Sequence, residues 1–115
     1  DWEREVTLVE GVFDAIVAGE NSIPLLGSTL REDSRLFRKI VKNDTPVLLG
    51  LDNDAHKKAM KLVKALLAYD IEVRLMDTSG HKDIGEMPPE VFQERKDKAS
   101  FIDSDAYLLK IALMA

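Results

Sequence analysis

Apolar residues in this chain gather in four short runs that alternate with amphipathic segments. The runs occupy residues 6–9, 24–27, 47–51 and 71–76. A short apolar run bounded by turn residues is typical of a strand buried on both faces. The segments between the runs, 12–18, 32–42 and 55–69, repeat apolar residues at helical spacing. Strands alternating with helices predict an α/β fold with a four-stranded parallel sheet and right-handed crossovers.

The pattern changes after the fourth run. Residues 78–85 form a polar loop, residues 88–96 predict a helix that begins at a proline, and residues 103–114 again repeat apolar positions at helical spacing. We therefore expect a core domain at residues 1–96 and a C-terminal helical extension at residues 97–115. The extension either belongs to the same structural unit or leads into a domain that the sequence does not contain.

The composition describes one soluble globular domain. The chain has 115 residues, of which 45% are hydrophobic and 32% charged, and it contains no cysteine. A chain of this length buries roughly two-thirds of its unfolded surface, so it needs no disulfide or structural metal. The lack of cysteine excludes thiol catalysis and cysteine-rich zinc modules. No apolar stretch approaches the roughly 20 residues of a membrane span and no signal peptide opens the chain, so we expect a cytoplasmic protein without membrane contact.

Carboxylates follow the predicted strands at the points where the strands end. Glu10 follows the first run, Asp52 and Asp54 follow the third, and Asp77 follows the fourth, with Asp83 in the loop beyond it. Ligands of an open parallel sheet bind outside the carboxyl ends of its strands. Carboxylates gathered there repel one another unless cations lie between them, and Mg²⁺ takes such oxygen ligands. The sequence therefore predicts a metal site in one crevice that four of these carboxylates share.

A purely structural interpretation competes with the metal site. Acidic residues at the start of a helix act as N-caps and favour the positive end of the helix dipole. This explains Asp54, which precedes a predicted helix. It does not explain Glu10, whose apolar neighbours would desolvate it. Asp14, one turn after Glu10, either braces the site or faces solvent.

The charge balance bears on the partner. With 16 Lys and Arg against 21 Asp and Glu, the net charge is −5, which at first sight counts against nucleic acid. Basic residues nevertheless form two helical stripes. One stripe consists of Arg31, Arg35, Arg38 and Lys42, and the other of Lys57, Lys58, Lys61 and Lys64. Such stripes are commonly solvated faces, but the second begins one turn from the predicted metal site and is the better candidate for contact with a nucleic-acid backbone. Lys82, beside Asp83, either contacts a triphosphate or is a solvated loop lysine.

Three motifs resemble those of a known family. Residues 8–15, Leu-Val-Glu-Gly-Val-Phe-Asp-Ala, resemble the Glu-Gly-x-x-Asp signature of the Toprim domain. Residues 51–59 resemble its Asp-x-Asp motif with the following helix. Residues 82–86, Lys-Asp-Ile-Gly-Glu, resemble the Lys-Asp-x-x-Glu segment of primase Toprim domains, especially those of phage helicase-primases. The match runs in order over residues 5–87.

The resemblance implies a Rossmann-like Toprim fold and Mg²⁺-dependent phosphoryl transfer on nucleic acid, with Mn²⁺ as a substitute. It implies that Asp52, Asp54 and Asp83 bind metal, and that Glu10 completes the metal cluster or serves as general base. Two departures are visible. The segment after Asp-x-Asp is one residue shorter than in primases and lacks their glycine, and Gly85 stands where bacterial cellular primases carry a second aspartate.

The expected function is that of a DNA primase catalytic domain of phage or bacterial type, which makes short RNA primers on a single-stranded DNA template from nucleoside triphosphates. The sequence contains no zinc-binding element, Walker motif or helicase segment. We therefore expect an excised domain that acts with a zinc-binding domain or replicative helicase and is not necessarily active alone. Two alternatives stay open: a Toprim domain of a topoisomerase or nuclease, and a non-catalytic replication module that binds metal or nucleotide and docks through the Tyr107 helix.

Overall fold

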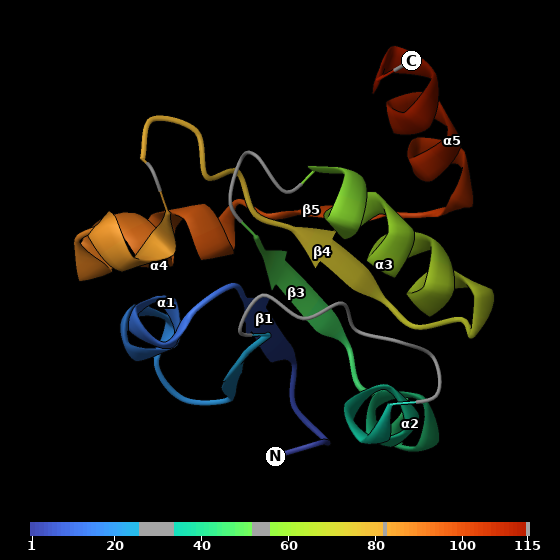
Figure 1. Cartoon of the computed structure of the whole chain (residues 1–115), viewed down its shortest axis with the longest axis horizontal. Coiled ribbons are helices and arrows are strands. Elements are labelled where there is room, and N and C mark those ends of the chain that lie inside the picture. Colours follow the sequence, from blue (N-terminus) through green and yellow to red (C-terminus); the bar gives the residue numbers. More distant parts are fainter. Residues whose placement is uncertain (26–33, 52–55, 82, 115) are drawn as a thin grey trace.

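Five strands form one sheet in the order β2-β1-β3-β4-β5 (Figure 1). The structure is a computed structural model, and it describes residues 1–25, 34–51, 56–81 and 83–114. The strands are β1 (Val6–Val9), β2 (Ser22–Pro24), β3 (Val47–Gly50), β4 (Val73–Leu75) and β5 (Ser100–Ile102). The first four are parallel to one another, and β5 pairs antiparallel with β4 at the edge.

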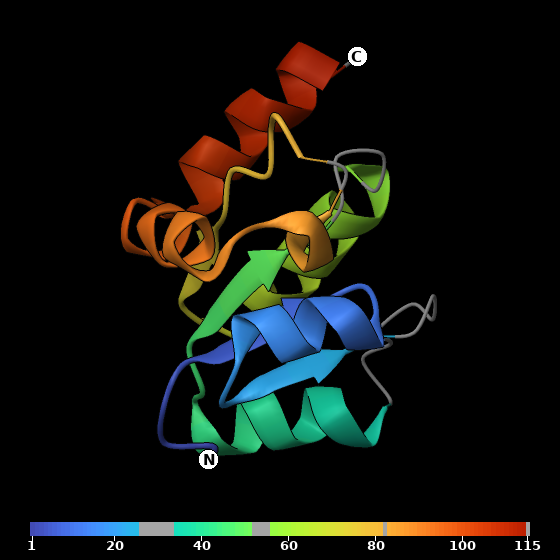
Figure 2. The same ribbon diagram turned by 90° about the vertical axis from the view of Figure 1, so that its left-hand side faces the viewer.

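Helices cover both faces of the sheet. The helices are α1 (Val12–Ala18), α2 (Arg35–Asn43), α3 (His56–Ala68), the short 3-10 helix η2 (Ile84–Glu86), α4 (Pro89–Asp97) and α5 (Ser104–Met114). α1 and α4 lie on one side of the sheet, and α2, α3 and α5 lie on the other (Figure 1). Figure 2 looks onto the side that carries α1 and α4. No helix in the described part of the chain is long and apolar enough to cross a bilayer.

Alternating side chains of β1 and β3 divide the core into two halves. Leu8 and Leu49 pack with α2 and α3, whereas Val9 and Leu48 pack with α1, η2 and α4. All four side chains are almost fully buried. Burying such a side chain contributes about 1.5–3 kcal/mol. Because both faces of the central strands are covered, these strands are continuously apolar rather than alternating.

The predicted α/β fold with four parallel strands is confirmed, with shifted boundaries at several elements. β2 lies at Ser22–Pro24 rather than at residues 24–27, of which 26 and 27 lie outside the described residues. α2 begins at Arg35, because Ser34 caps it by accepting a hydrogen bond from the Phe37 N–H at 3.1 Å. β4 is shorter than predicted, since the Ile71 N–H still donates to Leu66 O at the end of α3.

The fifth strand is an addition to the predicted fold. A helical extension was expected from residue 97 onward, but Ser100–Ile102 forms an edge strand in which Ile102 is paired with Val73. Only Ile102 of its three residues is buried, so no alternating pattern marks it. The strand places α5 against α3. The division at residue 97 stays a prediction, although the two sides of it share a sheet.

Arg74 fastens this edge of the sheet to the rest of the core. Its guanidinium donates to both carboxylate oxygens of Glu5, at 2.8 and 2.7 Å, and to Lys96 O at 3.0 Å. The same group lies 5.8 Å from the centroid of the Phe101 ring. The hydrogen bonds to Glu5 raise the pKa of Arg74. Through Arg74, strand β4 thus contacts three other parts of the chain: the residue before β1, the end of α4, and strand β5.

Candidate functional site

The order of the strands creates a crevice between β1 and β3. From β1 the chain moves to β2 on one side, and it then returns to β3 on the other. At such a switch point the helices leave in opposite directions, so ligands bind at the carboxyl ends of the two strands. Val9 and Gly50, the last residues of β1 and β3, are paired at this end, so Glu10 and Leu51 directly follow the two strand ends. Asp52 and Asp54 follow Leu51 in the sequence and lie outside the described residues, as does Lys82.

Glu10 carries an unsatisfied acceptor at the mouth of this crevice. Its Oε1 lies 3.1 Å from the Nζ of Lys58, which reaches across from α3. Its Oε2 is buried and has no hydrogen-bond partner among the described residues. A buried polar atom without a partner costs about 1–3 kcal/mol, so it marks a place where a ligand or ion would be stabilising. The expectation that Glu10 is desolvated is met in part, because its side chain is 24% exposed.

Asp14 is buried and braces the site, one of the two alternatives that the sequence left open. Its Oδ2 accepts the Gly11 N–H at 3.0 Å, and its Oδ1 accepts the Gly85 N–H at 2.6 Å. The residue is 6% exposed. An acid at the third position of a helix suits the first bond, since it caps the helix start. No local pattern in the sequence indicated the second bond, which joins residues 71 positions apart.

Asp83 lies in the turn that Asp14 holds. It is the N-cap of η2, and its Oδ1 accepts the Glu86 N–H at 3.1 Å. A Cβ built on Gly85 would lie 3.0 Å from Asp14 Oδ1 and 3.3 Å from Asp83 Oδ1, so the two carboxylates flank this glycine. Because glycine has no side chain, the two carboxylates can lie this close to the backbone of residue 85. The structure therefore brings Asp83 to the segment that follows Glu10.

Gly50 and Ile84 anchor the same turn on the sheet. Ile84 is fully buried with Val9 and Leu48. A Cβ on Gly50 would clash with Ile84 Cδ1, so any side chain at the end of β3 would force the Ile84 side chain to move. The turn that holds Asp83 is thus seated on the strand that leads to Asp52.

The lysines of α3 divide between two directions. Lys57, Lys61 and Lys64 are exposed, whereas Lys58 is half-buried against Glu10. Lys61 is four residues after Lys57 and Lys64 is three after Lys61, so these three lysines lie along one face of α3. Lys58 is rotated by about 100° around the helix axis from Lys57 and lies to the side of that face. Of the predicted stripe, three members therefore face solvent and Lys58 faces the crevice. Arg35, Arg38 and Lys42 of the other stripe are exposed as well, and Arg31 lies outside the described residues.

Within the described ranges, no three His, Asp or Glu side chains are grouped as a metal site requires. Glu10 and Asp83 would thus need a further acid. The Asp52–Asp54 segment, which the sequence predicts as the metal-binding pair, lies outside those ranges.

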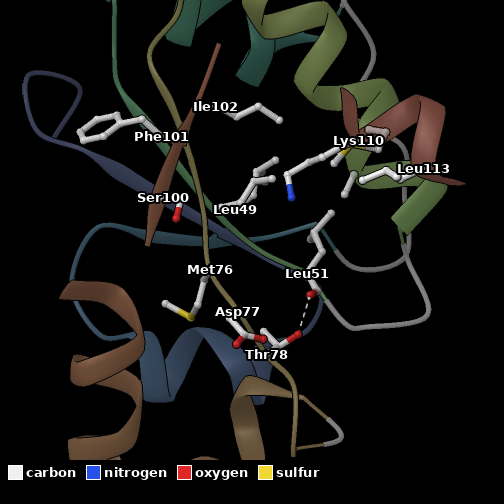
Figure 3. Close-up of a pocket in the computed structure, with 13 residues that line it drawn as sticks. Leu49, Leu51, Met76, Asp77, Thr78, Ser100, Phe101, Ile102, Lys110 and Leu113 are labelled. Carbon is white, nitrogen blue, oxygen red and sulfur yellow. Dashed lines mark hydrogen bonds between the residues drawn. The ribbon is translucent and has the colours of Figure 1, made fainter. Parts of the chain in front are cut away.

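A cavity of about 490 Å³ opens between the sheet and helices α3 and α5. Figure 3 shows its mainly apolar lining, with Asp77 and Thr78 at one end and the Lys110 side chain extending from α5 toward the middle. Its wall includes Leu51, the last described residue before Asp52. Among the described candidates Glu10, Lys57, Lys58, Lys61 and Asp83, none lines it.

Asp77 at the rim of this cavity is engaged in forming a turn. Its Oδ1 accepts the Ser79 N–H at 2.9 Å, and its Oδ2 lies 3.5 Å from Arg95 Nη1. The hydrogen bond from Ser79, aided by the Arg95 charge, lowers the pKa of Asp77. This carboxylate therefore stays charged and shapes the loop that leads from β4 toward η2.

No protein-family model and no curated protein matches this chain. Among solved structures, the chain is similar to the crystal structure of the Aquifex aeolicus primase, which holds zinc-binding and RNA polymerase domains. The TM-score is 0.69 at 20% sequence identity, over 85% of this chain. The match covers 26% of the primase chain, so this chain spans about a quarter of that length. The likeness concerns the fold, and the protein has an α/β fold like that of part of a bacterial primase.

Proposed function

We propose that this chain is the Toprim-type catalytic domain of a DNA primase, which joins nucleotides into short RNA primers on single-stranded DNA with Mg²⁺. The observation that carries the proposal is Glu10, which has one oxygen paired with Lys58 and the other buried without a partner among the described residues. It lies where a doubly wound sheet binds its ligands. The fold likeness to part of a primase supports the same function.

The donor set suits a hard divalent cation. Asp52, Asp54, Asp83 and Glu10 offer only carboxylate oxygens, which are the ligands that Mg²⁺ prefers. The unsatisfied Oε2 of Glu10 is an acceptor that such an ion would complete. Asp83 keeps lone pairs beyond its single hydrogen bond to the Glu86 N–H. Mn²⁺ has the same ligand preference and should replace Mg²⁺.

In the proposed reaction, a nucleotide 3′-hydroxyl attacks the α-phosphate of a nucleoside triphosphate, and pyrophosphate leaves. Bound Mg²⁺ would lower the pKa of that hydroxyl and neutralise charge on the triphosphate. Glu10 completes the carboxylate cluster or accepts the hydroxyl proton. Lys82, beside Asp83, and Lys58 attract the triphosphate as point charges, while Lys57, Lys61 and Lys64 contact the template backbone.

The partners of this domain follow from the same proposal. Template DNA and nucleoside triphosphates are its substrates. The chain spans a quarter of the primase that it is similar to, and that primase also holds a zinc-binding domain. A zinc-binding domain would select the start site, and a replicative helicase is the alternative protein partner.

Two measurements test the function. Mn²⁺ binding by the 115-residue chain is followed by electron paramagnetic resonance, and nucleotide incorporation on a single-stranded DNA template is followed with and without Mg²⁺. Asp52→Asn should abolish the incorporation and weaken the Mn²⁺ binding while leaving the circular dichroism spectrum unchanged.

The matched control is Asp70→Asn, which removes the same charge at an exposed position outside the crevice. Asp70 has a φ of 58°, a conformation that asparagine adopts readily. This variant should behave as the wild type. Full incorporation by Asp52→Asn, or a wild-type chain that does not bind Mn²⁺, would contradict the proposed function.

A further inference from the structure

We propose that Asp14 is a positioning residue, which holds the loop after Glu10 and the turn with Asp83 together so that both carboxylates face one bound cation. This inference rests on the proposed function for the cation. It assigns to Asp14 a task that neither Glu10 nor Asp83 can perform. Asp14 itself would not touch the ion.

The hydrogen bonds of Asp14 reach two segments that are distant in sequence. Gly11 directly follows Glu10, and its N–H donates to Asp14 Oδ2 at 3.0 Å. Gly85 is two residues beyond Asp83, and its N–H donates to Asp14 Oδ1 at 2.6 Å. One buried carboxylate therefore fixes the backbone beside both candidate ligands.

A cap of α1 alone would not require this arrangement. The bond to Gly11 completes the helix start, and it would be satisfied by one oxygen. The second oxygen instead accepts the Gly85 N–H and so links α1 to η2. The same turn packs on the sheet through Ile84, which contacts the end of β3. Both oxygens of Asp14 already accept an N–H, and the residue is only 6% exposed, so it offers an ion little access compared with Glu10 and Asp83.

The chemistry of the link requires a carboxylate. Each oxygen accepts a backbone N–H, so the side chain must present two acceptors and no donor. Asparagine has the same shape but would turn an NH₂ group toward one of the two N–H groups. Asp14→Asn therefore breaks one half of the link with little change in volume.

Cation binding by this variant is the main test. Mn²⁺ affinity of the 115-residue chain is measured by electron paramagnetic resonance, for the wild type and for Asp14→Asn. Loss of a residue that orients metal ligands typically weakens binding by about 10- to 100-fold, and we expect a loss of that size. Thr45→Val is the matched control, because Thr45 is fully buried and donates to Trp2 O at 2.6 Å at the opposite end of the strands. It should destabilise the fold yet keep wild-type Mn²⁺ affinity.

A second variant tests the link from its other end. In Gly85→Ala, the new Cβ would press against the oxygens of Asp14 and Asp83. It should weaken Mn²⁺ binding as Asp14→Asn does, and the double variant should be little worse than either single one. Strictly additive losses would indicate two independent effects and would overturn the inference.

Amide hydrogen exchange separates this inference from the proposed function. Asp14→Asn should speed exchange at Gly11 and Gly85 while the amides of β1 and β3 stay protected. If the wild type binds no Mn²⁺, the proposed function falls, and the inferred positioning for a cation falls with it even where the exchange result shows the link. If the wild type binds Mn²⁺ and Asp14→Asn binds it equally well, the proposed function stands and the positioning role alone is overturned.

Discussion

The Nζ of Lys58 lies 3.1 Å from Oε1 of Glu10, so an ammonium group from α3 neutralises the carboxylate that ends β1. The two residues are 48 positions apart, and their side chains are 22% and 24% exposed. A lysine in this position has two effects on a nearby cation. It holds the Glu10 carboxylate toward α3, and its own charge repels the cation.

We expect repulsion to dominate when Lys58 is replaced. Lys58→Gln should bind Mg²⁺ severalfold more tightly in calorimetric titrations, because a positive charge next to Glu10 is removed. Loss of this partly buried ion pair should cost about 1 kcal/mol of stability in urea unfolding. Lys61→Gln, on the exposed face of the same helix, is the control and should change neither quantity. Weaker Mg²⁺ binding by Lys58→Gln would show instead that the lysine orients Glu10.

The exposed lysines of α3 predict the salt dependence of DNA binding. Replacing Lys57, Lys61 and Lys64 together by glutamine should make the slope of log K against log salt shallower by about 2, since each backbone contact to a single strand contributes about 0.7. Fluorescence anisotropy with a single-stranded oligonucleotide measures this slope. The control replaces Arg35, Arg38 and Lys42 of α2, which are equally many and also exposed. Equal flattening in both variants would mean that only overall charge matters.

Gly50 and Ile84 should be coupled in stability. Gly50→Ala inserts a methyl group against Ile84 Cδ1 and should destabilise the protein by about 1–3 kcal/mol in urea unfolding. Ile84→Val lacks that carbon and should cost about 0.5–1.5 kcal/mol by itself. The double variant should be more stable than the sum of the two losses predicts, because the clash is gone. Simple additivity would show that the turn is not seated on Gly50.

Asp77 should make the stability of the fold depend on pH in acid. Its pKa is lowered from the ordinary value of 3.8, chiefly by the Ser79 N–H. The folded state thus favours the charged form, so this contribution is complete above the unfolded pKa and is lost as the pH falls through the lower folded pKa. Asp77→Asn should therefore lose less stability than the wild type when thermal unfolding is compared at pH 7 and in this acidic window. Asp70→Asn, an exposed control, should keep the wild-type acid dependence.

Local patterns were sufficient for most of the fold. Four apolar runs and the helices between them specify parallel strands, because a strand covered on both faces must be apolar throughout. The same patterns put Glu10 at a strand end and Asp83 in the loop after β4. They did not reveal β5, since three residues with one buried side chain carry no periodic signal.

Local patterns also left the direction of several side chains open. Lys58 belonged to a four-lysine stripe in the sequence, yet it is the one of the four that turns into the crevice. Its partner Glu10 directly follows β1, and nothing within helix α3 indicates which of its lysines will meet that residue. Asp14 was equally open between a brace and a solvent-exposed acid.

The sequence alone determined what depends on neighbours along the chain: the four parallel strands, the helices between them, their buried faces, and Glu10 directly after the first strand. Only the tertiary structure decided the strand order that creates the crevice, the Lys58–Glu10 pair and the bond from Gly85 to Asp14. These relationships join residues 48 and 71 positions apart. They arise from the packing of whole elements, which periodicity within one element does not encode.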